Sequence, residues 1–194
     1  LYQKGKVVYK LDNIATGEYG NNIIMNGTYD IYVNGKDIKE YNLSSYRRLF
    51  ACAFQDGTIF PGTVRYNVLM GREGTDAEVT EALQKAGVYE KIGHLPLGFD
   101  TPLTKEFDEN GTMLSGGECQ KLLVARAFAK PAPMAIFDEP SSALDPIAEH
   151  ELLSGILQET DGKTRVLISH RLSCVKYADH VLLLENGKVA EEGT

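Results

Sequence analysis

The sequence predicts an α/β fold with a mainly parallel core sheet, and three observations favour it. Residues 134–137 form an unbroken apolar run, Met-Ala-Ile-Phe, which is typical of a strand buried on both faces of a parallel sheet. A helix-like run at 119–130 precedes this strand. A second buried strand is expected at 165–169, after a helix that we expect from Pro146 to about Gln158.

Two carboxylates, Asp138 and Glu139, follow the first of these strands directly. In an open α/β sheet, ligands bind just beyond the carboxyl ends of the strands. Two acids at such a place are costly to bury unless they hold a cation or handle a proton. The pair is therefore a candidate for metal and proton chemistry.

The start of the 119–130 helix carries a phosphate-binding pattern. Ser115 and Glu118 have the spacing of a capping box, and Gly116 and Gly117 between them let a ligand approach the backbone closely. Free N–H groups at a helix N-terminus attract phosphate. A capped helix without a ligand is the simpler alternative, but the two glycines and the nearby acid pair favour phosphate binding.

These motifs and three others resemble the ATP-binding cassette, the nucleotide-binding domain of ABC transporters. The segments, in chain order, are FQD (54–56), similar to the Q-loop; LSGGE (114–118), similar to the signature; PMAIFDEP (133–140), similar to the Walker B strand; SSALD (141–145), similar to the D-loop; and LISHRLS (167–173), similar to the switch-histidine segment. Five motifs in this order are a specific signal. The resemblance covers residues 30–194 well and the first thirty residues poorly.

The resemblance implies a P-loop NTPase-like ABC ATPase fold, with a mainly parallel core sheet, an antiparallel β subdomain and a helical subdomain. We expect a single nucleotide-binding domain over residues 1–194. Its core and β subdomain would occupy 1–61 and 131–194, and its helical subdomain 62–130. Asn34-Gly35 and Asn186-Gly187 predict the turns of two antiparallel hairpins.

The resemblance also implies catalytic roles. Asp138 would hold Mg²⁺, and Glu139 would accept the proton of the water that attacks ATP. Gln55 would reach both the metal and the water. His170, at the end of a predicted strand, would contact the γ-phosphate. Tyr2 is a candidate for stacking on the adenine, although an ordinary strand tyrosine is the alternative.

Further residues would serve a second copy of the domain. Ser115, Gly116 and Gly117 would bind the ATP held by that copy, and Asp145 would lie where the two copies meet. Catalysis would therefore need a head-to-tail dimer of nucleotide-binding domains with ATP between them. Within one subunit, Ser115 is expected away from the four catalytic residues.

Composition limits the partners and the location. Twenty basic against 27 acidic residues give a net charge of −7, which argues against a nucleic-acid partner. The three cysteines show no C-x-x-C spacing, which argues against a structural zinc or disulfide framework. No apolar run approaches the length of a membrane span. The resemblance implies a transmembrane domain as partner and a place at the cytoplasmic face of the cell membrane.

The phosphate loop of the family, G-x-x-x-x-G-K-[ST], is missing from this chain. Gly162-Lys163-Thr164 is not a substitute, because Leu157 stands where the first glycine should be. The family spends about twenty more residues than this chain between Ile14 and Asp30. Since every later motif is intact, we expect the natural protein to contain the loop, and we expect a backbone discontinuity between residues 14 and 30.

Three functions compete. The first is the ATP-hydrolysing motor of an ABC exporter, because residues 56–71 resemble exporter-type cassettes. The second is a degenerate cassette that binds a partner without hydrolysing ATP, which the missing phosphate loop favours. The third is a soluble ABC ATPase without a transport role, which the acidic composition and the exporter-like segment oppose.

Overall fold

The computed structural model describes residues 7–19, 22–33, 36–104, 109, 111–160, 162–186 and 188–193. Tyr2, the candidate for adenine stacking, lies outside them. The chain divides into two compact units, one of residues 1–47 with 171–194 and one of residues 48–170. These limits differ from the subdomain boundaries expected at 61/62 and 130/131, which stay predictions.

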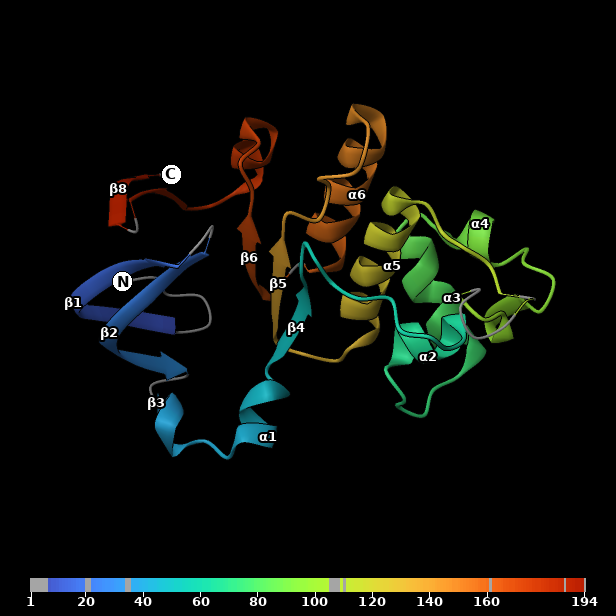
Figure 1. Ribbon diagram of the computed structural model, residues 1–194, viewed down its shortest axis with the longest axis horizontal. Helices are drawn as coiled ribbons and strands as arrows, with labels where there is room; N and C mark the ends of the chain where they lie inside the picture. Colours follow the sequence, from blue (N-terminus) through green and yellow to red (C-terminus); the bar gives the residue numbers. More distant parts are fainter. Residues whose placement is uncertain are drawn as a thin grey trace. The chain divides into compact units, whose positions relative to one another are not determined.

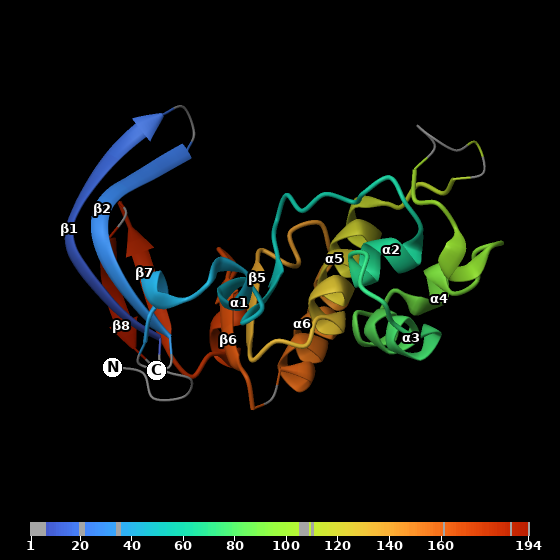
Figure 2. The ribbon, with the colours of Figure 1, turned by 90° about the horizontal axis from the view of Figure 1, so that it is seen from below.

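The first unit holds antiparallel strands and short helices (Figures 1 and 2). Its elements are β1 (Val7–Tyr19), β2 (Asn22–Val33), β3 (Lys36–Asp37), η1 (Ile38–Glu40), α1 (Leu43–Arg47), η3 (Leu172–Tyr177), β7 (Val181–Glu185) and β8 (Lys188–Gly193). The antiparallel pairing of β2 with β3, and of β7 with β8, agrees with the two predicted hairpins. The Asn34-Gly35 turn itself and Gly187 lie outside the described residues.

The stretch where the family has its phosphate loop is a hairpin in this chain. β1 and β2 pair antiparallel up to Tyr19 and Asn22, with an irregularity between Asp12 and Ala15. The expected discontinuity between residues 14 and 30 stays a prediction. Among the described residues of 7–33 there is no phosphate loop and no helix to follow it.

The second unit is built on a parallel sheet, as the sequence predicted, and the strand order is β4–β5–β6. Its strands are β4 (Phe50–Ala53), β5 (Met134–Asp138) and β6 (Thr164–Ile168). In the register of the sheet, Ala53 lies opposite Phe137, and Phe137 lies opposite Leu167. Because the strands run parallel, the residues that follow them meet at one edge.

Among the described residues, six helical segments complete the second unit. They are α2 (Val64–Leu69), α3 (Asp76–Lys85), α4 (Tyr89–Ile92), η2 (Gly98–Asp100), α5 (Gly116–Ala129) and α6 (Pro146–Glu159). Both views place α5 and α6 on the same side of the sheet. Phe128 of α5 meets Phe137 of β5 edge to face, with ring centroids 6.1 Å apart. The core lies between the sheet and these helices and continues into α2, α3 and α4, where Val64, Leu83 and Ile92 are fully buried.

On the opposite face of the sheet, the described helices of the second unit provide no such cover (Figures 1 and 2). Cys52, Ile136 and Val166 are register partners across the three strands. Cys52 and Ile136 are half-buried, and Val166 is 39% exposed. Parallel sheets are normally covered on both faces. Within the described residues, the second unit is thus a parallel sheet with one well-buried face.

Side-chain caps define where the longer helices begin, and the capping box of α5 agrees with the sequence prediction. In α5, Ser115 N–H donates to Glu118 at 2.8 Å, and Glu118 N–H donates to the Ser115 hydroxyl at 3.3 Å. In α3, Thr75 and Glu78 form the same reciprocal pair at the same two distances. Asp145 caps α6 by accepting from the N–H groups of residues 147 and 148, with Pro146 at the first helical position.

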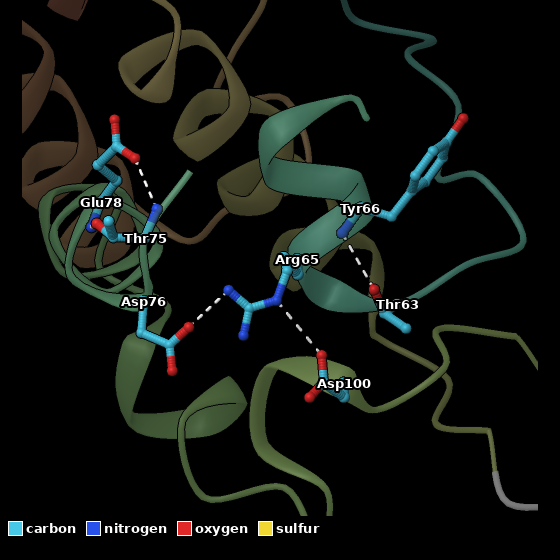
Figure 3. A network of polar contacts seen from close by, with 7 residues as sticks. All are labelled: Thr63, Arg65, Tyr66, Thr75, Asp76, Glu78 and Asp100. Carbon is cyan, nitrogen blue, oxygen red and sulfur yellow. Dashed lines mark hydrogen bonds and ion pairs between the residues drawn. The ribbon is translucent and has the colours of Figure 1, made fainter. Parts of the chain in front are cut away.

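An ion-pair network joins the helices on the surface (Figure 3). Arg65 of α2 pairs with Asp76 at the start of α3, at 2.6 Å, and with Asp100 of η2, at 3.4 Å. Both carboxylates are mostly exposed. Exposed pairs of this kind contribute about 0–1 kcal/mol each. The network orders the surface without being the main source of stability.

The uncovered sheet face predicts an asymmetry between two identical substitutions. Val166→Thr on that face should change the free energy of unfolding by less than about 0.5 kcal/mol. Val124→Thr in α5 should cost about 1–3 kcal/mol, because Val124 is fully buried and the hydroxyl would lose water. Urea unfolding of the purified chain measures both. A Val166→Thr cost as large as that of Val124→Thr would mean that the face is covered in the folded protein.

Asp145 predicts a pH-dependent stability. The N–H groups of Ala148 and Ile147 hold the pKa of its carboxyl below the ordinary value of 3.8. A carboxyl with a lowered folded-state pKa stabilises the fold above 3.8, and this contribution is lost as the pH falls through the folded-state pKa. Asp145→Asn keeps the cap but not the charge, so it should be less stable at neutral pH. Thermal midpoints across the acid range should converge for the two proteins; a gap that stays constant would contradict the assignment.

Candidate functional site

The predicted catalytic residues follow three neighbouring parallel strands. Gln55 comes just after β4, Asp138 ends β5 with Glu139 after it, and His170 comes just after β6. Since β5 pairs parallel with both neighbours, these residues meet at one edge of the sheet. This is the arrangement that the sequence predicted.

Glu139 and His170 are in direct contact. The Nδ1 atom of His170 lies 2.8 Å from Oε1 of Glu139. The Glu139 side chain is 21% exposed and that of His170 is 69% exposed, so the pair is accessible from solvent. A partly buried carboxylate beside an exposed imidazole can accept a proton and keep a fixed orientation.

Glu139 has a strained backbone. Its φ angle is +45°, in the left-handed region that favours glycine. Such a conformation costs of the order of 1–3 kcal/mol and persists only where neighbours enforce it. Here the Glu139 N–H donates to the carbonyl of Ile168 on β6, at 2.9 Å. The strain falls on the residue that was predicted to act as the base, which supports a functional reason for it.

Gln120 fixes the turn after Glu139 and was missed by the sequence analysis. Its amide nitrogen donates to the hydroxyl of Ser142 and, at 3.5 Å, to the carbonyl of Glu139. Its amide oxygen accepts from the N–H of Ala143 at 2.8 Å. Gln120 is nearly buried on α5. The available signal was a polar residue on the inward face of the predicted helix.

The N-terminus of α5 lies against the same turn. A Cβ atom added to Gly117 would come within 2.9 Å of Leu144 Cδ2. At Gly116 the nearest heavy atom, Ala143 Cβ, would be 3.7 Å away, which is ordinary contact. Gly117 therefore packs closely against the Leu144 side chain. The sequence analysis had assigned both glycines to the approach of a ligand.

A hollow of about 600 Å³ connects the Q-loop residue to the signature. Its lining residues are Gln55, Asp56, Gly57, Gly116, Cys119, Gln120, Leu123, Ser142 and Ala143. Ser115, Asp138, Glu139 and His170 do not line it. The predicted separation of Ser115 from the catalytic residues stays a prediction, but Gln55 shares this hollow with the glycine that follows Ser115.

The cysteine in the hollow is not activated. Burial raises the pKa of the Cys119 thiol, and the neighbouring Glu118 carboxylate raises it further. A thiol with a raised pKa carries little thiolate at neutral pH and is a poor nucleophile. Nucleophilic catalysis by Cys119 therefore has no support.

The site offers oxygen ligands for a hard cation. Asp138 and Gln55 end or follow adjacent strands and carry carboxylate and amide oxygens. Among the described residues, no group of three or more His, Cys, Asp or Glu side chains could hold a metal ion. Mg²⁺ commonly takes only one or two protein ligands and completes its shell with phosphate oxygens and water. The residues present fit magnesium that arrives with a nucleotide.

The helices of the described chain were also compared with the requirements of a membrane span. None of them is both long enough and apolar enough to cross a bilayer.

Comparisons with known proteins agree with this geometry. The mitochondrial iron-sulfur clusters transporter ATM1 of Saccharomyces cerevisiae is 43% identical over 166 residues, which cover 84% of this chain and 24% of the relative. The mitochondrial iron-sulfur clusters transporter ABCB7 of Homo sapiens is 39% identical over 165 residues, covering 84% of this chain and 21% of the relative. The chain thus spans about a quarter of the length of these relatives.

A solved structure and a family model lead to the same family. A bacterial Atm1-family ABC exporter with ATP bound superposes with a TM-score of 0.78 and 34% identity, covering 86% of this chain and 29% of that one. Residues 20–142 match the family described as ABC transporter. Because this match covers more than half of the chain, the chain belongs to the ABC transporter family, as an ATP-binding cassette of the exporter type.

Proposed function

We propose that this cassette hydrolyses ATP to drive an exporter, with Gln55, Asp138, Glu139 and His170 forming its catalytic edge. The observation that carries the proposal is the 2.8 Å contact between Glu139 and His170, at the edge where three parallel strands end. The strained backbone of Glu139 supports it, since strain is retained where function needs it.

Glu139 is the base in this mechanism. Its carboxylate accepts the proton of the water that attacks the γ-phosphate. His170 holds the carboxylate in place through Nδ1, and its other ring nitrogen contacts the γ-phosphate. Asp138 and Gln55 would hold Mg²⁺, which would supply positive charge to neutralise the phosphate oxygens. Gln55 also orients the attacking water.

The signature residues act on the ATP of a second nucleotide-binding domain. Ser115, Gly116 and Gly117 form the N-terminal end of α5, a helix of 14 residues. Backbone N–H groups at such an end favour phosphate oxygens. Asp145 at the start of α6 faces the second domain in the same head-to-tail dimer. Two cassettes therefore complete each other's sites.

The full-length transporter also contains a transmembrane domain in this proposal. The chain spans about a quarter of the length of its curated relatives, so the rest of a full-length protein of that kind has room for membrane-spanning segments. The cassette then works at the cytoplasmic face of the cell membrane and passes the energy of ATP hydrolysis to that domain.

A second candidate is a cassette that supplies its signature but hydrolyses no ATP of its own. The specific observation in its favour is the β1–β2 hairpin, which stands where the family has its phosphate loop. In that case Ser115 and its glycines would still act on a partner's ATP, while Glu139 would stay idle. The two candidates differ in whether Glu139 limits the rate of hydrolysis.

Glu139→Gln tests the choice between the two candidates. The amide keeps the shape of the side chain but loses the base, so ATP hydrolysis by the full-length protein should fall by about 10²–10⁴-fold. Binding of ATP should persist. Phosphate release and nucleotide binding measure the two quantities. Hydrolysis at the native rate would reject the catalytic role and favour the cassette that only supplies its signature.

Ser115→Ala tests the signature, and Thr75→Ala is a matched control. Both substitutions remove a capping box with the same two hydrogen-bond distances, so both should cost about 1 kcal/mol of stability. Only Ser115→Ala should also reduce ATP turnover, because only that cap belongs to the signature. Thermal unfolding and phosphate release separate the effects. An equal loss of turnover in Thr75→Ala would show that stability alone explains the Ser115 result.

A further inference from the structure

We propose that Arg126 and Asn67 are positioning residues that clamp the segment after Gln55 onto α5. This segment, residues 56–63, is called the post-glutamine loop below. The clamp makes Gln55 and the signature end of α5 move together. The inference rests on the proposed ATPase function, because the role of Gln55 comes from that proposal.

Arg126 grips the loop from α5. Its Nε donates to the carbonyl of Asn67 at 2.8 Å, and its Nη2 donates to Oδ1 of Asn67 at 3.1 Å. Both Nη atoms donate to the carbonyl of Thr58, at 3.2 Å each. The guanidinium also lies over the Phe60 ring, 5.4 Å from its centroid. A planar fork of five N–H donors can make these contacts at once.

Asn67 holds the other end of the loop. The residue is fully buried on α2. Its Oδ1 accepts from the N–H of Phe60 at 2.8 Å, and its Nδ2 donates to the carbonyls of Phe60 at 3.0 Å and Thr63 at 3.1 Å. The Asn67 side chain thus forms hydrogen bonds with both the N–H and the carbonyl of Phe60, as the backbone of a neighbouring strand would. Removing it would leave these groups without their partner.

The contact between the post-glutamine loop and α5 extends to Gly57, two residues after Gln55. A Cβ atom added to Gly57 would come within 2.8 Å of Leu123 on α5, so the backbone there lies directly on the helix. Leu123 and Arg126 are three residues apart and share one face of α5. Towards its N-terminus, α5 contributes Gly116 and Gln120 to the hollow that Gln55 lines. One helix therefore holds the post-glutamine loop and carries the signature.

The contacts of Arg126 indicate that it positions the loop and adds little to the stability of the fold. Arg126 is partly buried, and burial lowers the pKa of its guanidinium. Its described hydrogen-bond acceptors are carbonyl and amide oxygens. A buried charge is a poor source of net stability compared with apolar packing. Its fixed fork instead determines where the loop lies relative to the helix.

Arg126→Lys tests the clamp, with Arg65→Lys as the matched control. Lysine keeps the charge but has a single side-chain nitrogen, which cannot donate to Thr58 and to Asn67 with the geometry of the guanidinium. Arg65 makes exposed ion pairs from the same helix as Asn67, so its substitution leaves the clamp intact (Figure 3). Both variants are made in the full-length protein. Amide hydrogen exchange and the kcat and KM of ATP turnover are measured for each.

In Arg126→Lys, exchange at the Gly57 and Phe60 amides should accelerate about tenfold or more, because Thr58 and Asn67 lose the charged donor that holds the loop in place. Exchange in α3 should stay as in the native protein. The kcat should fall about tenfold while KM stays within about twofold, since the change affects orientation and not binding. Arg65→Lys should leave all of these values unchanged.

Three results would overturn the proposal. The first is unchanged exchange at Phe60, and the second is equal acceleration in α3, which would mean a general loss of stability. The third is local acceleration with a native kcat, which would make Arg126 purely structural. If the native protein itself hydrolyses no ATP, the proposed function fails, and the exchange pattern still decides whether the clamp exists. Phe60→Leu, which removes the ring under the guanidinium, should give a smaller change in the same direction and serves if Arg126→Lys does not fold.

Discussion

The parallel pairing of β5 with both β4 and β6 is the constraint on which the rest of the second unit depends. Phe137 at the centre of this pairing is fully buried, and α5 packs on the same face. In a parallel sheet all strands end at the same edge, so Gln55, Glu139 and His170, which follow the three strands, lie at one edge. The strain at Glu139 follows from the same pairing, because its N–H stays bonded to β6 while the chain turns away.

The uncovered face of the sheet and the missing phosphate loop are two aspects of one deficit. A parallel sheet in an α/β fold is normally covered on both faces, and here one apolar face, which includes Val166, is open among the described residues. The sequence lacks the segment that would have supplied a further strand and helix.

Much of this arrangement could be predicted because its signals are local. The buried strand at β5 is an apolar run, and the starts of α3, α5 and α6 are capping residues within three positions of the groups that they cap. The edge site followed from the order of motifs along a parallel sheet. Antiparallel hairpins at both ends were predicted from Asn-Gly turns.

The remaining features depend on partners that are distant in sequence. Arg126 contacts residues 59 and 68 positions away, and Gln120 contacts residues 19 to 23 positions away. No local pattern marks either residue as more than a polar side chain on a helix. The left-handed backbone of Glu139 and the packing of Gly117 on Leu144 likewise require the folded neighbours. Local chemistry therefore predicts the reacting groups, while long-range packing determines how their side chains are held.

α5 carries most of that long-range packing. Its first turn presents the signature, Gln120 supports the turn after Glu139, and Arg126 holds the loop after Gln55. A helix is stiff over this length, so α5 gives all three contacts one rigid support. The catalytic edge and the signature are thus joined through one rigid element. A rearrangement that moves Gln55 must either move this helix or break the hydrogen bonds that Arg126 makes.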